Sequence, residues 1–333
     1  MELKEVGEFG LIDLLKQDTI HDSRTVVVGI GDDAAVLLPG PQQLQLVTAD
    51  MLVEKIHFDL STTTARQLGY KSVAVNFSDI AAMGGTPKHV VVSIALPAAL
   101  SVEFVTDLYA GMKDICREYK ANIVGGDTVA SPSGLVINVT ALGEVAAEHV
   151  IRRSGARPGD VVAVTNTLGD SAAGLELLQR GDWVHHDYAG PLIAAHLTPR
   201  PQVRVGMLLA QRGVTSMDDI SDGLASELHE IASASNVSLR IEADRIPLSQ
   251  AVRYGAALCN RSPLDYALYG GEDFQLLFTM PPAKFLDLIE GDGGAVFVKI
   301  GEVLPPGEGV QLTYGEGTMQ PIRPRGYNHF RHE

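Results

Sequence analysis

The sequence predicts a mixed α/β (α+β) protein made of two halves that meet near residue 150. Three observations support this prediction. The chain has 333 residues, a length for which two domains are the best prior. In both halves, short runs rich in Val, Ile and Leu alternate with runs of helical periodicity. A basic stretch that contains Gly and Pro, residues 152–160, lies between the halves. We therefore expect an α/β domain at residues 1–150 and an α+β domain at residues 151–333.

The elements follow from the local patterns in chain order. In the first half, β-rich runs predict strands at residues 25–30, 44–48, 89–96, 121–124 and 135–145, and helical spacing predicts helices at 64–83 and 101–119. In the second half, we expect strands at residues 161–165, 239–241, 274–279 and 295–300, and helices at 206–211 and 224–234.

Composition excludes several classes of function. The formal net charge of −15 disfavours nucleic acid as a partner, because an acidic surface repels phosphate backbones. The longest apolar stretches, such as residues 90–100, are too short to span a bilayer, and the first residues lack a signal-peptide pattern. A cytoplasmic protein with no membrane partner is expected. Cys116 and Cys259 form no metal-binding pattern and are predicted to be buried free thiols.

The informative feature is the setting of the aspartates, which lie at the edges of apolar runs beside Gly, Ser, Thr or Asn. They are Asp32, Asp33, Asp50, Asp79, Asp127, Asp219 and Asp222. Taken singly, each is more often a helix cap or a turn residue. Carboxylates that converge need a cation or a proton to neutralise them, and Mg²⁺ commonly bridges a few carboxylates to nucleotide phosphates. Together they favour a site for Mg²⁺ and a nucleotide.

Glycines next to two of these acids favour the same chemistry. Gly125-Gly126-Asp127-Thr128 follows a predicted strand, where backbone amides can approach phosphate oxygens, and residues 270–273 repeat the pattern before a strand. A glycine pair can equally be a simple turn. The sequence has no GxxxxGK[ST] loop, GxGxxG fingerprint, HRD loop, GxSxG elbow or HExxH motif, so an ATP enzyme here would use a less common fold.

Six motifs, in order, resemble those of the thiamine-monophosphate kinases. They are residues 29–35 (GIGDDAA), 75–84 (VNFSDIAAMG), 125–128 (GGDT), 153–160 (RSGARPGD), 219–224 (DISDGL) and 270–274 (GGEDF). The ending at residues 326–330 (GYNHF) is also similar, so the resemblance covers nearly the whole chain. Related synthetases share the fold, but this chain has neither the early Cys of selenophosphate synthetase nor the Cys-bearing tail of the hydrogenase-maturation protein.

The resemblance implies a two-domain PurM-like architecture, in which strands of the N-terminal domain contribute to a β-barrel at the interface of a homodimer. It also implies a reaction, in which the γ-phosphoryl group of ATP passes directly to the phosphate of thiamine monophosphate. No covalent nucleophile is expected, because such catalysis depends on positioning and charge neutralisation.

The resemblance also assigns roles to residues. The implied ligands of several Mg²⁺ ions are Asp33, Thr48, Ala49, Asp50, Asp79, Asp127, Asp219 and Asp222. The implied ATP contacts are Tyr109, Gly126, Asp127, Arg153 and Ser221, and the implied contacts to thiamine monophosphate are His57, Glu272 and Tyr327. Ala49 can offer only its carbonyl oxygen, and Asp32 ranks below Asp33. Packing alone would explain Tyr109 and His57 equally well, Arg152 is a competing basic residue, and Pro324 departs from an aromatic found in some relatives.

Two other functions remain open at this point. A purine-pathway synthetase with the same fold would activate an amide oxygen rather than a phosphate. A non-catalytic nucleotide-binding module would need fewer carboxylates than both halves supply.

Overall fold

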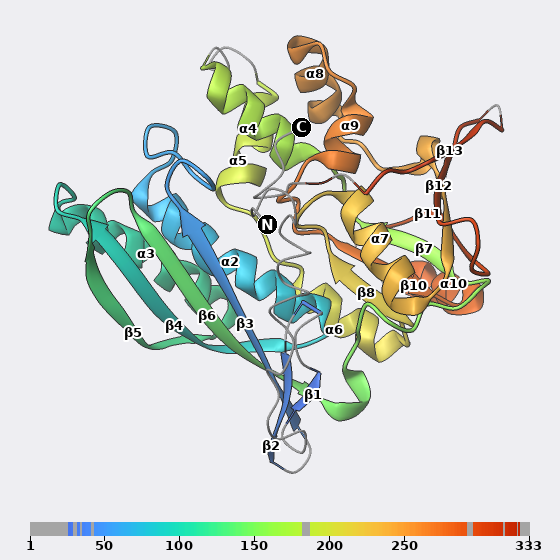
Figure 1. Ribbon diagram of the computed structural model, residues 1–333, viewed down its shortest axis with the longest axis horizontal. Coiled ribbons are helices and arrows are strands. Elements are labelled where there is room, and N and C mark those ends of the chain that lie inside the picture. The colour runs from blue at the N-terminus through green and yellow to red at the C-terminus, as the bar shows by residue number, and fades with distance from the viewer. Residues whose placement is uncertain are drawn as a thin grey trace, which may run out of the picture.

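The first of two β-sheets lies in the N-terminal half of the chain (Figure 1). The structure is a computed structural model that describes residues 26–28, 32–33, 35–40, 43–181, 187–291, 296–315, 317–324 and 326. The strands of the first sheet are β1 (Val26–Val28), β2 (Ala35–Gly40), β3 (Gln43–Val53), β4 (Thr86–Pro97), β5 (Asn122–Ser131) and β6 (Val136–Ala146). Their order is β1-β2-β3-β6-β4-β5, with only the β4–β5 pair parallel.

Residues on this sheet alternate between a buried and a more open face, as a period of two requires. On β3, Leu44, Leu46, Thr48 and Leu52 are buried, whereas Met51 is about half exposed, at 52%. Helices α2 (Ala65–Ala82) and α3 (Val102–Tyr119) cover the buried face. Asp50 shares the parity of Thr48 and therefore faces α2.

Helix α2 is the centre of the molecule. It begins at a capping box in which Thr64 and Gln67 satisfy each other's backbone N–H groups. It also crosses α3 very closely, because a Cβ on Gly69 would lie 1.8 Å from the Leu108 carbonyl oxygen. Helix α6 (Val203–Arg212) packs against another side of it through Gly206. The helix is therefore buried around most of its circumference, and the polar residues it carries lie inside the protein.

The second sheet belongs to the C-terminal half (Figure 1). Its order is β13-β12-β9-β11-β7-β10-β8. These strands are β7 (Val161–Thr165), β8 (Ser216–Asp219), β9 (Ser238–Glu242), β10 (Leu276–Met280), β11 (Phe297–Leu304), β12 (Val310–Thr313) and β13 (Met319–Pro321). The remaining helices are α4 (Asp170–Arg180), α5 (Ala189–Leu197), α7 (Leu224–Ser235), α8 (Gln250–Cys259), α9 (Pro263–Tyr269) and α10 (Pro282–Gly291), with short 3₁₀ turns at Ala147–His149 and Ala243–Arg245.

The predicted fold class, a mixed α and β protein of two domains, is confirmed. Three predicted strand ends are wrong, because β3 continues past Thr48 to Val53, β5 past Val124 to Ser131 and β11 past Ile300 to Leu304. Asp50 and the Gly125–Gly126 pair therefore lie within strands rather than after them. Gly126 serves close strand packing, since a Cβ there would lie 1.9 Å from the Val92 carbonyl oxygen. Cys116 is buried as predicted, whereas Cys259 is only partly buried. Among the helices that the structure describes, none is long and apolar enough to cross a membrane.

Candidate active site

Three carboxylates converge between the two sheets. Asp33 comes from the segment before β2, and Asp218 and Asp219 end β8. One carboxylate oxygen from each lies within 4.8 Å of the others. The side chains of Asp33 and Asp218 are 2% and 0% exposed. Such a group of buried like charges needs a compensating cation.

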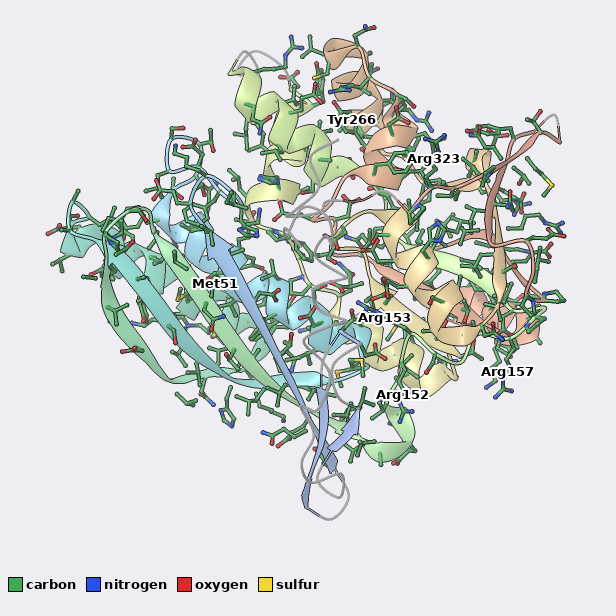
Figure 2. All side chains as sticks on the ribbon, viewed as in Figure 1. Met51, Arg152, Arg153, Arg157, Tyr266 and Arg323 are labelled. Atoms are coloured by element: carbon green, nitrogen blue, oxygen red, sulfur yellow. The ribbon has the colours of Figure 1, made fainter. Side chains whose placement is uncertain are left out.

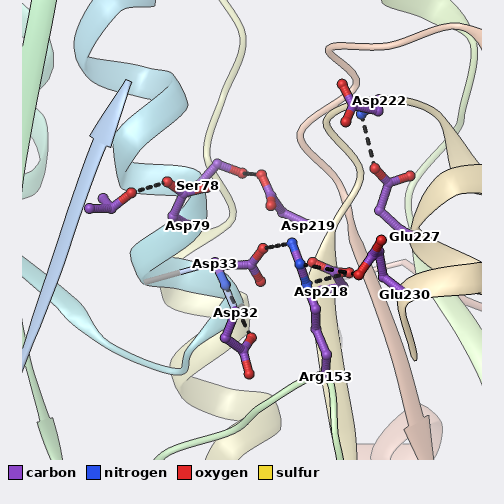
Figure 3. A network of polar contacts seen from close by, with 11 residues as sticks. Asp32, Asp33, Ser78, Asp79, Arg153, Asp218, Asp219, Asp222, Glu227 and Glu230 are labelled. Atoms are coloured by element: carbon purple, nitrogen blue, oxygen red, sulfur yellow. Dashed lines mark hydrogen bonds and ion pairs between the residues drawn. The ribbon is translucent and has the colours of Figure 1, made fainter. Parts of the chain in front are cut away.

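Arg153 supplies part of that positive charge. Its guanidinium forms an ion pair with Asp33, lies 3.0 Å from an Asp218 oxygen through Nε, and lies 3.6 Å from Glu230 on α7 (Figure 3). The neighbouring Arg152 is exposed and lies nearer the rim of the molecule (Figure 2). The structure thus separates the two candidate arginines, and only Arg153 reaches the acidic site.

Asp50 and Asp79 extend the acidic site towards the first sheet. Thr48 on β3 donates a hydrogen bond to Asp79 on α2, and Ser78 donates one to Asp219. Burial, and then the neighbouring carboxylates Asp50, Asp219 and Asp33, raise the pKa of Asp79 well above its usual value. Burial and then Asp33 raise the pKa of Asp50 to about 6. The two domains therefore share one acidic centre.

The site fits magnesium by the chemistry of its donors. Asp33 Oδ2 and both oxygens of Asp218 are buried and accept no hydrogen bond from the residues that the structure describes. Burial also raises the pKa values of Asp218 and Asp219 well above the usual value. Carboxylate oxygens that are unsatisfied, and that have no imidazole or thiolate in their group among the described residues, are the donor set that Mg²⁺ prefers. Asp32, which ranks below Asp33 as a candidate ligand, accepts a hydrogen bond of 3.1 Å at Oδ1 from the Asp33 amide.

Residues 219–223 and 270–274, two of the acidic motifs, lie side by side. The Glu272 amide donates to the Ser221 carbonyl oxygen at 2.6 Å, and the Phe274 amide donates to the Ile220 carbonyl oxygen at 2.8 Å. Asp222 follows on the same segment, outside the group formed by Asp33, Asp218 and Asp219, and its amide donates to buried Glu227 at 3.0 Å. This pairing joins the acidic site to Glu272.

Glu272 has two partners from other elements. Its Oε2 lies 2.8 Å from Lys71 Nζ on α2 and 3.1 Å from His196 Nδ1 on α5. His57, also expected at the acceptor, accepts a 3.0 Å hydrogen bond from the Val53 amide at the end of β3. Tyr327 lies outside the described residues. Gly326 packs against Asp222, since a Cβ there would lie 2.8 Å from the Asp222 carbonyl oxygen.

The structure does not bring Asp127, Gly126 or Tyr109 to this centre within one chain. Asp127 is exposed on β5 and pairs with Ser93 of β4. When this row of paired residues is followed across β6 to β3, it ends at Met51 rather than at Asp50. Three strand spacings separate Asp127 from β3, or about 14 Å, and it lies on the open face of the sheet. Tyr109 packs half-buried on α3. Ala49, with an exposed side chain beside Thr48, offers only its carbonyl oxygen, as expected.

Sequence reasoning missed four buried residues of the site: Lys71, His196, Asp218 and Glu227. Asp218 directly precedes the recognised segment that starts at Asp219, and it lies in a strand whose four residues are all buried. Lys71 lies among apolar residues of α2, a helix that also carries Asn76 and Asp79. A charged residue in such a setting is rarely buried unless it is paired, and that rule was the available signal.

Fold and site together define an AIR synthase-related protein. The model described as AIR synthase related protein, N-terminal domain, matches residues 31–145, and the C-terminal domain model matches residues 157–312. The thiamine-monophosphate kinase of Bacillus subtilis (strain 168) is 37% identical over 334 residues, covering 98% of this chain and 100% of the relative. That of Aquifex aeolicus (strain VF5) is 38% identical over 333 residues, covering 99% and 100%.

The structural comparison agrees with these relatives. A solved structure described as AaThiL complexed with AMPPCP and TMP has a TM-score of 0.87 and 37% identity, with 99% of both chains covered. The chain belongs to the thiamine-monophosphate kinase family, and the resemblance noted in its motifs is confirmed.

Proposed function

We propose that this protein transfers the γ-phosphoryl group of ATP to the phosphate of thiamine monophosphate, giving thiamine diphosphate and ADP. The observation that carries this proposal is the buried acidic centre of Asp33, Asp218 and Asp219, joined by backbone hydrogen bonds to the segment that holds Glu272. Family membership over the full chain supports the same reaction. An acidic centre for phosphates, with Glu272 as a separate polar group that binds the acceptor, suits the transfer of a phosphoryl group between two phosphorylated molecules.

The acidic residues would hold magnesium in this proposal. Asp33, Asp50, Asp79 and Asp219 are the proposed ligands from the described acidic centre, with Asp218 added to the earlier expectation. Bound Mg²⁺ would neutralise the phosphate oxygens of both substrates. Arg153 would contact the nucleotide phosphates, because its planar fork can bind two oxygens. Ser221 and Asp222 would lie beside the nucleotide, and Glu272, His57 and Tyr327 would bind the acceptor.

We further propose that the protein acts as a homodimer. Within the described residues, β5 is an exposed edge strand, with Val124 and Val129 57% and 51% exposed, and β2 pairs with β3 only as far as Val47. Exposed edges with apolar side chains are usually covered. A barrel built from two such sheets would set β5 of one copy beside residues 48–53 of the other. That arrangement would bring Asp127 and Gly126 towards Asp50. A cytoplasmic location also stays a prediction.

The test is a direct assay. Purified protein with ATP, MgCl₂ and thiamine monophosphate should produce thiamine diphosphate and ADP in equal amounts, measured by chromatography. EDTA should abolish the reaction, and Asp219→Asn should remove most of it while leaving the fold intact. Release of ADP only with a purine-pathway ribonucleotide would instead make the protein a synthetase and overturn the proposal.

A further inference from the structure

Lys71 is a buried cation in the middle of α2. Only 2% of the residue is exposed, and Val73, Ala74 and Phe77 nearby on the same helix are buried apolar residues. A lysine in such surroundings is costly unless its charge is paired. Its Nζ lies 2.8 Å from Glu272 Oε2. Lys71 belongs to the first domain and Glu272 to the second, so this contact crosses between the domains.

His196 approaches the same oxygen from α5. Its Nδ1 lies 3.1 Å from Glu272 Oε2 and 3.3 Å from the Ser171 hydroxyl on α4. Burial, and then Lys71, lower the pKa of His196, so its ring is neutral at neutral pH and donates from Nδ1 to the carboxylate. Two elements of the chain, α2 and α5, thus hold one carboxylate oxygen, and α4 contacts His196 through Ser171.

The backbone at Glu272 is also restrained. Its φ angle is +66°, in the left-handed region that a residue with a Cβ rarely adopts. Such a conformation persists only when the surrounding structure enforces it. The hydrogen bond from the Glu272 amide to Ser221 and the contacts from Lys71 and His196 provide that enforcement.

Charge decides what this carboxylate can offer a ligand. Burial alone would raise the pKa of Glu272, but Lys71 and then His196 hold it down at about 2. The other acids near it, Asp273 and Asp170, lie on its own loop and at the start of α4. The Lys71–Glu272 pair is therefore neutral as a unit. The contacts from Lys71 and His196 both fall on Oε2, and 26% of the Glu272 side chain is exposed.

We propose that Lys71 is a positioning residue that neutralises and orients Glu272, so that Oε1 accepts a hydrogen bond from the amino group of the acceptor's aminopyrimidine ring. This rests on the proposed function. The pair discriminates by hydrogen bonding rather than by attraction to the thiazolium charge, because Lys71 already balances the charge of Glu272. A site built to pair with an N–H group rejects an analogue that lacks it.

The wild-type protein provides the first test, free of any folding risk. The probe is oxythiamine monophosphate, in which a carbonyl oxygen replaces the amino group. The acceptor KM should be at least about tenfold higher for this analogue than for thiamine monophosphate, the effect of a lost hydrogen bond to a charged group. Glu272→Gln should lose most of this discrimination. Equal KM values for both acceptors in the wild type would overturn the proposal.

The second test separates positioning from simple stabilisation. Lys71→Met and Glu272→Gln should each raise the KM for thiamine monophosphate about tenfold or more, with the KM for ATP unchanged. The double variant should be no worse than the poorer single variant, because the two residues act through one contact. Ser72→Ala is the matched control, since Ser72 is equally buried on α2 but its hydroxyl donates to the Gly69 carbonyl oxygen rather than to Glu272.

The outcomes distinguish this inference from the proposed function. No turnover of thiamine monophosphate by the wild type would sink the proposed function. Two outcomes, each with normal wild-type turnover, would contradict the role of Lys71. One is an additive effect in the double variant, and the other is an unchanged acceptor KM in Lys71→Met. If Lys71→Met does not fold, Lys71→Gln and the analogue measurement decide the question.

Discussion

Arg153 Nε lies 3.0 Å from the Asp218 carboxylate, and this contact ties the segment between the domains to the strand that carries the acidic centre. Asp218 is fully buried and neither of its oxygens accepts a hydrogen bond from the described residues. The charge of Arg153 is therefore its main compensation in the absence of a metal ion. Arg153 also forms an ion pair with Asp33. The guanidinium and a bound cation would therefore interact with the same carboxylates.

The first prediction concerns the stability that Arg153 provides. In EDTA, Arg153→Gln should lower the free energy of unfolding by about 3 kcal/mol, the low end for breaking a buried ion pair, because two buried carboxylates lose their counter-charge. Excess MgCl₂ should restore part of the loss by binding the folded state. Arg152→Gln, on the exposed neighbour, should change the free energy by less than about 0.5 kcal/mol. Urea denaturation measures both variants, and equal losses would contradict the prediction.

The second prediction concerns pH. The folded-state pKa of Asp50, about 6, lies above its ordinary value of 3.8, so the folded protein binds this proton more tightly than the unfolded chain does. The metal-free protein should therefore gain stability as pH falls from about 7 to about 5. Mg²⁺ competes with the same protons, so the stabilisation that it adds should shrink over that window.

Melting temperatures in excess MgCl₂ and in EDTA, measured between pH 5 and pH 7, check this prediction. The two curves should converge at the acidic end. Asp50→Asn should weaken the pH dependence, because the variant removes one of the titrating groups. A magnesium-induced shift of equal size at both ends of the window would show that the acidic centre does not bind the ion.

The third prediction concerns which chain of the proposed homodimer supplies Asp127 to each active site. Asp127→Asn and Asp33→Asn should each be inactive as pure proteins. Dimers formed by refolding the two variants together in equal amounts should regain about a quarter of wild-type activity, because half are mixed and each mixed dimer has one intact site. Asp127 is exposed, so its variant should keep the wild-type melting temperature. Failure to recover activity in demonstrably mixed dimers would place Asp127 in the site of its own chain.

The residues of the acidic centre were predicted from the sequence more accurately than the strand bounds and buried residues around them. Asp33, Asp79 and Asp219 were recognised because each falls within one of the motifs that resemble those of the family. Asp218 has no such marker, since an acid inside a short strand resembles any exposed strand residue. Gly125 and Gly126 were expected to follow a strand, where they could approach phosphate oxygens or form a turn, but both lie within β5, and Gly126 serves close packing against Val92 of a neighbouring strand. Lys71 carried a signal in its apolar surroundings, but its partner Glu272, like the role of His196, could be recognised only from tertiary contacts.

The burial of α2 has a consequence for which molecules the protein can accept. Lys71 and Asp79 lie eight residues apart, and positions i and i+8, about 80° apart around the axis, fall within one broad face of a helix. The rise between them is about 12 Å. Since neighbours enclose the helix on most sides, neither residue can shift along it without repacking the interior. Helix α2 therefore fixes the distance between the proposed contact to the acceptor's ring and the acidic centre proposed to bind its phosphate. Acceptors with a shorter or longer link between ring and phosphate should be poor substrates, however well each end binds by itself.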